Sequence, residues 1–195
     1  MALFRTISSP EPLPPIVGDN VVLRMPQASD YEGWAALREA SRGFLTPWEP
    51  TWPADDLTRG AYRQRLRRYA EDVRTDQGYP FFVFRKEDGV LVGGLALANI
   101  RRGVAQAASL GYWMGAPHVR RGYMSAAVRA LLPSAFDVLR LHRVEAACIP
   151  TNMASVRLLE RCGFQREGYA RAYLCINGMW QDHLLYARLR SDAGR

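Results

Sequence analysis

Hydrophobic positions along this chain recur with two periods, which predicts strands that alternate with helices. Dense apolar runs predict strands at residues 21–24, 79–85, 90–100, 107–114 and 143–149. The dipeptides Asp88-Gly89 and Asn177-Gly178 are typical of tight hairpin turns. We therefore expect residues 79–100 to form an antiparallel pair and residues 165–189 to form two long closing strands.

Apolar residues three or four positions apart predict helices in four places. The first runs from about Asp30 to Ala40, after the capping-box pattern of Ser29 and Glu32. A strongly basic helix follows at residues 57–73, and another begins at Met124 or Ser125 and reaches residue 139. Pro133 should kink that helix, because it lacks a backbone N–H. A short last helix is capped by Asn152 and stopped by Gly163.

Prolines mark the segments that should lack long helices. Residues 1–18 contain four of them and predict an extended lead-in. Residues 44–53 contain three, together with large aromatic side chains, and predict a loop. Residues 19–190 then form a single domain of ordinary size, followed by a short tail at 191–195.

Composition narrows the function classes. The formal net charge of +7 and the pI near 9.7 favour acidic partners, such as a nucleotide cofactor or a ribonucleoprotein surface. The sequence has no RNA-recognition motif, so we do not expect direct nucleic-acid binding. No membrane-length apolar run and no signal peptide are present, which predicts a soluble, cytoplasmic protein. Three widely spaced cysteines predict buried, reduced thiols and no metal site (Cys148, Cys162 and Cys175).

The stretch 110–125 combines an apolar strand, a Gly/Pro break, a basic turn around Gly122 and the start of a helix. A turn of this kind aims several unpaired backbone N–H groups outward, and the helix adds the positive end of its dipole. This segment is therefore a candidate cradle for an anion such as a diphosphate.

Taken in order, four patches of the chain resemble the GNAT acetyltransferase superfamily, and in particular its ribosomal-protein-alanine N-acetyltransferases. The patches are residues 44–50 (FLTPWEP), 110–113 (LGYW), 121–124 (RGYM) and 159–183 (LERCGF to NGMWQDH). The resemblance implies an α/β fold with a mixed, mostly antiparallel sheet of about seven strands and about four flanking helices. It also implies that strand 110–114 splays from strand 143–149.

The same resemblance implies acetyl-CoA as co-substrate. Its pantetheine arm would pair with the backbone of Tyr112, Trp113 and Met114, and Asn152 would contact the arm further on. The diphosphate would be held by the backbone amides of a set of consecutive residues (Arg120, Arg121, Gly122, Tyr123, Met124 and Ser125). The chain departs from the family pattern at Val119, Arg120 and Met124. Because backbone amides do the binding, we expect those replacements to be tolerated where φ stays negative.

Catalytic side chains common in the family are replaced here by Ser109, Ala147 and Leu159. An N-terminal α-amine, with an ordinary pKa of about 7.7 to 8.0, needs far less help from a base than a lysine at about 10.4. Ser155 resembles the serine proposed in this branch to protonate the leaving thiolate; its alternative role is in capping the short helix. Glu49 either contacts the substrate ammonium or is a solvated loop carboxylate.

For several other side chains the sequence allows both a functional and a structural role. Trp48 and Trp52 either wall the substrate pocket or pack within their loop. Glu145 is a remote base or, more simply, the partner of a nearby arginine. His118 and His183 are expected to be structural or surface residues, and the basic helix to present a solvated face.

These patterns lead to a functional hypothesis: acetyl transfer from acetyl-CoA to the N-terminal α-amine of a protein, in particular a ribosomal protein that starts with Ala. The partner would be that protein or the ribosome, and the enzyme a monomer or homodimer. Two alternatives are acetylation of a small amine (a polyamine, an aminoglycoside or an amino-acid-like metabolite) and CoA binding without turnover.

Overall fold

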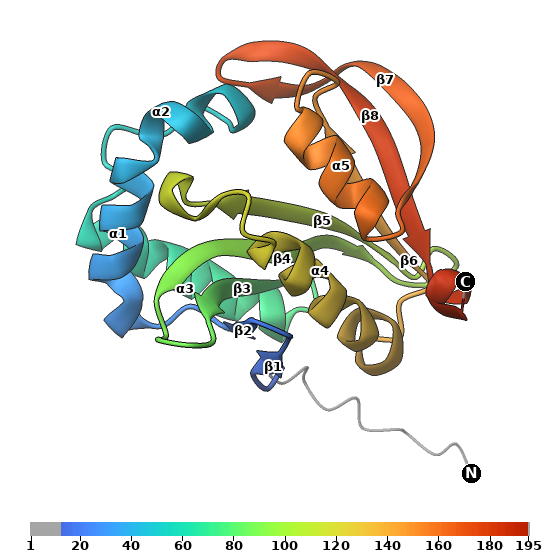
Figure 1. The fold of residues 1–195 in the computed structure, drawn as a ribbon, viewed down its shortest axis with the longest axis horizontal. Helices are drawn as coiled ribbons and strands as arrows, with labels where there is room; N and C mark the ends of the chain where they lie inside the picture. The colour runs from blue at the N-terminus through green and yellow to red at the C-terminus, as the bar shows by residue number, and fades with distance from the viewer. Residues whose placement is uncertain (1–12, 195) are drawn as a thin grey trace.

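The computed structural model describes residues 13–194. All its strands belong to one eight-stranded sheet, in the order β1-β2-β3-β4-β5-β6-β8-β7 (Figure 1). Every neighbouring pair is antiparallel except β5 with β6, which is parallel. The strands are β1 (Ile16–Val17), β2 (Val21–Arg24), β3 (Gly78–Arg85), β4 (Leu91–Arg101), β5 (Ala107–Met114), β6 (Arg143–Cys148), β7 (Gln165–Ile176) and β8 (Met179–Leu189).

Five α-helices accompany the sheet: α1 (Tyr31–Ala40), α2 (Arg42–Leu45), α3 (Arg59–Arg74), α4 (Tyr123–Pro133) and α5 (Met153–Arg161). Short 3₁₀ turns lie at Ala28–Asp30, Thr46–Trp48, Ala116–His118 and Arg190–Gly194. A five-residue π-helix, Ser134–Val138, continues directly from α4. In the part of the chain that the structure describes, no helix is both long and apolar enough to cross a membrane.

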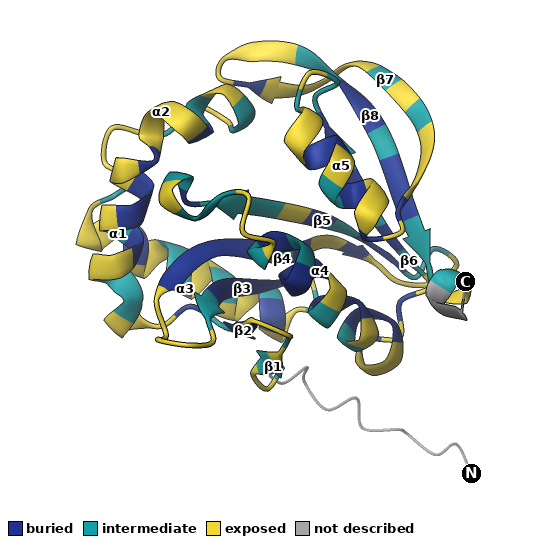
Figure 2. Ribbon diagram, viewed as in Figure 1, coloured by how far each residue is buried: buried dark blue, intermediate teal, exposed yellow. Residues whose placement is uncertain are grey.

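Two buried clusters hold the helices against the two faces of the sheet. The larger cluster packs α4 and α5 onto one face, with Phe81, Val128 and Leu159 among its residues. The smaller cluster joins Trp34 of α1 and Tyr62 of α3 to Phe82, which points to the other face of β3. Figure 2 shows the buried positions gathered on β3, β4 and the inner side of α4, whereas most of β7 is exposed.

The helix predictions from the sequence are confirmed in position and corrected in detail. The helix after the basic turn begins at Tyr123, and Pro133 ends its regular part, where the π-helix takes over. The capping role given to Ser29 was wrong. Instead, the capping box is formed by Gln27 and Asp30, two residues earlier than expected: the Asp30 side chain accepts a hydrogen bond of 2.7 Å from the Gln27 backbone N–H.

The segments expected to be irregular contain more structure than proline content indicated. Part of the lead-in forms the short strand β1, while residues 1–12 lie outside the described residues. The aromatic loop includes α2 and a 3₁₀ turn, and the tail begins with another turn. Cys148 and Cys162 are buried free thiols as expected, but Cys175 is exposed, because it lies on the solvent side of the edge strand β7.

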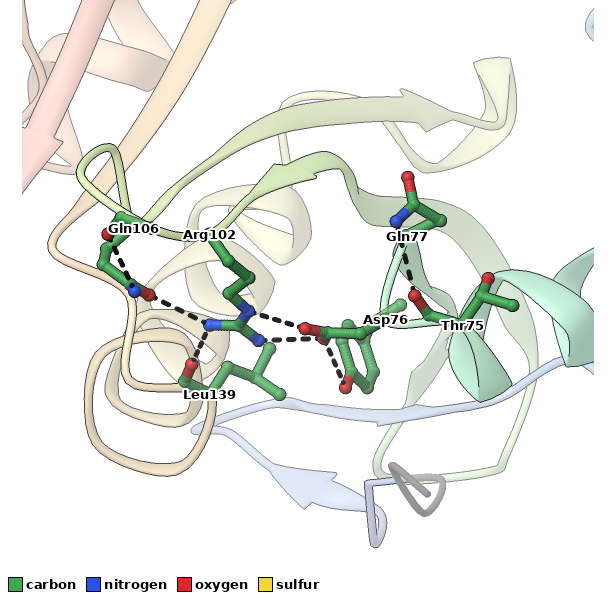
Figure 3. Close-up of polar contacts among 8 residues, drawn as sticks. Thr75, Asp76, Gln77, Arg102, Gln106 and Leu139 are labelled. Carbon is green, nitrogen blue, oxygen red and sulfur yellow. Dashed lines mark hydrogen bonds and ion pairs between the residues drawn. The ribbon is translucent and has the colours of Figure 1, made fainter. Parts of the chain in front are cut away.

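Arg102 joins three segments at the end of the molecule where β4 turns into β5 (Figure 3). Its guanidinium donates to both carboxylate oxygens of Asp76, at 2.6 and 2.8 Å, and to the Leu139 carbonyl oxygen at 2.6 Å. Asp76 also accepts a 3.1 Å hydrogen bond from the Tyr79 hydroxyl. This network fixes the β4–β5 turn to the α3–β3 turn and to the end of the α4 segment.

Candidate active site

The sheet opens between β5 and β6. These strands pair only over Ala107–Ser109 and Arg143–Glu145, although β5 continues to Met114 and β6 to Cys148. Beyond this point β5 stays bonded to β4 and β6 to β8, so the two halves of the sheet diverge. The edge of β5 from Leu110 to Met114 is therefore free toward the opening, as the sequence predicted.

The basic turn forms a concave array of donors at the start of α4. Within the described residues, no protein acceptor pairs with the backbone N–H groups of residues 119–125. Arg120 and Gly122 both have positive φ, at 60° and 78°, and they alternate with residues of ordinary conformation. Alternation of this kind turns successive N–H groups toward one point, where an anion binds. The array and the helix dipole together suit a diphosphate.

The conformation of Arg120 corrects one expectation. We expected replacements in this turn to be tolerated where φ stays negative, whereas Arg120 has a positive φ of 60°. The turn requires that backbone conformation whichever side chain is present, and the left-handed conformation costs a residue with a Cβ roughly 1–2 kcal/mol. Gly122 takes the same conformation without that penalty, and a Cβ built there would meet open space.

Two hydroxyl groups meet across the opening. The Tyr112 phenol on β5 and the Ser155 hydroxyl on α5 are 2.5 Å apart, and either can donate. Ser155 is only 8% exposed. Burial raises the pKa of Tyr112, so its hydroxyl keeps its proton at neutral pH. The pair therefore holds protons in a buried place between the diverging strands.

Asn152 fixes Ser155 in this place. Its side-chain oxygen accepts a 3.1 Å hydrogen bond from the Ser155 backbone N–H, which caps α5. The capping interaction thus uses the serine backbone and leaves the serine hydroxyl for Tyr112. The two interpretations of Ser155 do not compete, because they concern different atoms.

A cavity of about 400 Å³ lies on the α1 and α3 side of the sheet. Its wall includes Gly111, Tyr112 and Trp113, which belong to the same part of β5 that borders the opening. Other lining residues come from α1, α3 and the segment between them, and they include Trp34, Arg38, Glu49, Trp52, Asp56, Arg65 and Tyr69. Trp52 lines this cavity, whereas Trp48 is not among the residues that line it.

Glu49 is neither solvated nor free. Arg38 donates to both of its carboxylate oxygens, at 2.8 and 2.7 Å, and the Trp52 indole N–H donates to Oε2 at 2.7 Å. The Arg38 guanidinium also stacks over the rings of Trp52 and Trp113, 3.9 and 5.0 Å from their centroids. These contacts order the aromatic segment into one wall of the cavity.

Close backbone packing places this wall against β5. A Cβ at Gly94 would lie 2.6 Å from the Trp113 indole nitrogen, so the glycine on β4 makes room for that ring. A Cβ at Gly115 would lie 2.4 Å from Leu37, so α1 reaches the end of β5 only because Gly115 is small. Buried Ser41 then accepts a 2.9 Å hydrogen bond from the Ala116 N–H.

The remaining candidates are Glu145 and the two histidines, His118 and His183. Glu145 pairs with Arg101 and, at 2.8 Å, with Arg143, as its simpler interpretation held. His183 is 3% exposed, and His118 has a buried ring nitrogen without a described partner. Burial, Arg85 and Arg121 lower the pKa of His118, so its ring is neutral at pH 7.

Sequence reasoning missed Arg38, Asp56 and Arg65. They belong to the cavity, but no motif surrounds them. Arg65 lies on the helix that was interpreted as a solvated basic face, although its position between Tyr62 and Tyr69 places it on the apolar side. That helical phase was the signal that could have found it.

A splayed parallel pair beside an array of unpaired amides defines the class of protein, and the sequence comparison agrees with it. The model of the acetyltransferase (GNAT) domain matches residues 20–165. The chain belongs to this family and is a GNAT-type N-acetyltransferase, with acetyl-CoA as its co-substrate. The unpaired amides and the free edge of β5 fit the diphosphate and the amide-containing arm of that molecule.

Similar proteins refine this placement. The probable N-acetyltransferase YjcK of Bacillus subtilis is 36% identical over 90% of this chain and 97% of its own length. The ribosomal protein uS5-alanine N-acetyltransferase of Escherichia coli is 32% identical over 89% of this chain and 90% of its own. The structure of Mycobacterium smegmatis RimJ in complex with CoA-disulfide matches with a TM-score of 0.87 and 29% sequence identity, and the match covers 95% of this chain and 90% of that one.

Proposed function

We propose that this enzyme acetylates the N-terminal α-amine of a protein, in particular a ribosomal protein that starts with Ala. One observation carries the proposal: the segment Gly111 to Trp113 borders both the opening of the sheet and the cavity. A thioester held along β5 from one side can thus meet an amine that enters from the other. Similarity to a uS5-alanine acetyltransferase supports this acceptor and a place in the cytoplasm.

Bound acetyl-CoA supplies an activated acetyl thioester, and the residues of the chain do the rest. The cradle amides and the β5 edge orient this co-substrate, and the wall of Trp52 and Trp113 excludes water from the acceptor. An α-amine loses its proton near neutral pH, so no strong base is needed. Ser155 donates a proton to the leaving thiolate and takes one from Tyr112 through their hydrogen bond. The proton that the attacking nitrogen loses goes to solvent, and Tyr112 is reprotonated from solvent.

Glu49 completes the proposed site as a carboxylate of the acceptor cavity. Because Arg38 occupies both of its oxygens, its direct part is to hold Arg38 and Trp52 in place and to offset the arginine charge near an incoming ammonium. Trp48 directly precedes Glu49 at the end of a 3₁₀ turn and is not among the residues that line the cavity.

The experiment is a thiol-release assay with acetyl-CoA and peptides of about ten residues that differ in their first residue. We expect turnover with Ala-starting peptides and none with the same peptides acetylated at the N-terminus. Mass spectrometry should place the added acetyl group on the α-amine. Failure to acetylate any free N-terminus would exclude the proposal.

A small amine is the second candidate, because a cavity of about 400 Å³ is also the size of a small-molecule site. Polyamines, aminoglycosides and amino-acid derivatives tested in the same assay separate the two acceptor classes. Higher kcat/KM for a small amine than for every peptide would favour this candidate.

A further inference from the structure

Two carboxylates line the cavity, and the structure gives them different partners. Both oxygens of Glu49 accept hydrogen bonds from Arg38, and one accepts a further bond from Trp52. Asp56 uses one oxygen only, since Arg65 donates to Oδ1 at 2.6 Å. Among the described residues, no donor pairs with Oδ2 of Asp56. Of the two groups, Asp56 therefore has an oxygen left for a ligand.

The position of Asp56 makes this oxygen useful. Its side chain is 13% exposed and lies in the turn just before α3, where its own backbone N–H bonds to the Pro53 carbonyl at 3.0 Å. The aromatic rings of Trp34, Tyr69 and Trp113 line the same cavity. A largely buried carboxylate in a cavity lined by aromatic residues attracts a cation more strongly than one in open solvent.

The positive and negative charges of the residues that line the cavity are equal in number. Arg38 and Arg65 carry two positive charges, and Glu49 and Asp56 carry two negative charges, each arginine being paired with one carboxylate. An incoming ammonium thus meets no net positive field. An incoming carboxylate, by contrast, meets two arginines whose positive charges Glu49 and Asp56 already offset.

From these contacts we infer that Asp56 Oδ2 binds the ammonium of the acceptor, and that the cavity selects primary ammonium groups without an adjacent carboxylate. The inference rests on the proposed function and deepens it. It names the N-terminus of a peptide or an amino-acid amide as the preferred acceptor class, and it disfavours the free amino acid. Asp56 is a binding residue in this scheme, since the proton must leave the ammonium before attack.

The test compares Asp56→Asn with Asp55→Asn. The asparagine at 56 keeps a carbonyl oxygen for Arg65 and removes the charge, and exposed Asp55 next to it serves as the matched control. With L-alaninamide as acceptor we expect Asp56→Asn to raise the acceptor KM roughly tenfold or more, the range for losing a hydrogen bond to a charged group. The kcat and the acetyl-CoA KM should stay within about threefold. Equal acceptor KM values for the two variants would overturn the inference.

A binding measurement separates this inference from the proposed function. Calorimetric titration of the CoA-loaded enzyme with L-alaninamide, N-acetyl-L-alaninamide and L-alanine needs no turnover. We expect the first probe to bind at least several-fold more tightly than the other two, and Asp56→Asn to remove that preference. A wild-type enzyme without the preference would refute the ammonium site even if peptides are acetylated. Preference without peptide turnover would refute the proposed function and keep the site.

Discussion

The two hydroxyl groups of Tyr112 and Ser155 show how chemistry depends on single residues in this enzyme. They come from β5 and α5, on the two sides of the opening, and their oxygens lie 2.5 Å apart. In a GNAT chain with Ser109, Ala147 and Leu159 at three frequent catalytic positions, this pair is the proton donor that we propose. In this proposal both hydroxyl groups form the proton donor, so mutation of each residue in turn separates their contributions to kcat.

Ser155→Ala should lower kcat by roughly a hundredfold, the scale of losing one general acid, while the acetyl-CoA KM changes little. Tyr112→Phe, which keeps the ring, should lower kcat less, because the serine hydroxyl remains. Steady-state kinetics with a saturating acceptor checks both variants. A larger loss for Tyr112→Phe than for Ser155→Ala would reverse the two roles.

At the scale of elements, the cradle is made by a turn and a helix start rather than by particular side chains. Its donors are backbone N–H groups of residues 119–125, turned inward by positive φ at Arg120 and Gly122. Val119, Arg120 and Met124 can therefore replace the family's usual residues. What the turn cannot accept is a group that fills the concave side or repels an anion.

Gly122→Asp should raise the acetyl-CoA KM at least tenfold, because it brings a negative charge to the diphosphate site. Gly103→Asp is the matched control: Gly103 has φ +64°, open space around its Cβ position and a place at the other end of β5. Both variants place an aspartate at a left-handed position, which destabilises the fold by a similar amount in each, so their melting temperatures should fall equally. Calorimetric titration with CoA checks the difference, and equal affinities would contradict the role of the cradle.

At the scale of the whole molecule, side-chain hydrogen bonds connect turns that are far apart in the sequence. Arg102 binds Asp76 and the Leu139 carbonyl, which joins the turns after α3 and β4 to the end of the α4 segment (Figure 3). The cradle is at the start of α4 and the cavity lies beside α3, so this network fixes the far ends of both elements without touching either site.

Arg102→Met should destabilise the fold by about 1–2 kcal/mol, a value reduced for the partial exposure of the ion pair, and lower the melting temperature by roughly 3–6 °C. The kcat and both KM values should remain as in the wild type. Arg74→Met, which breaks an exposed pair with Glu71, should leave the melting temperature unchanged. Scanning calorimetry checks this, and equal melting temperatures for the two variants would show that the network adds no stability.

By itself the sequence determined the elements and the cradle, because the signals for them are local. The hydrophobic period located the main strands and helices, and Asn177-Gly178 located the last hairpin. A glycine in a basic turn pointed to the segment whose backbone N–H groups are unpaired in the structure. The resemblance carried by four patches added the splay between β5 and β6. None of these required knowledge of which distant side chains meet.

Only the tertiary structure decided which charged side chains line the cavity and how they pair. Glu49 stood out in the sequence, yet Arg38, eleven residues earlier, occupies both of its oxygens. Asp56 did not stand out, yet it keeps an oxygen free beside the cavity. The physical reason is that the partners of a side chain depend on packing between elements far apart in the sequence, whereas hydrophobic period and turn chemistry are set by neighbours along the chain.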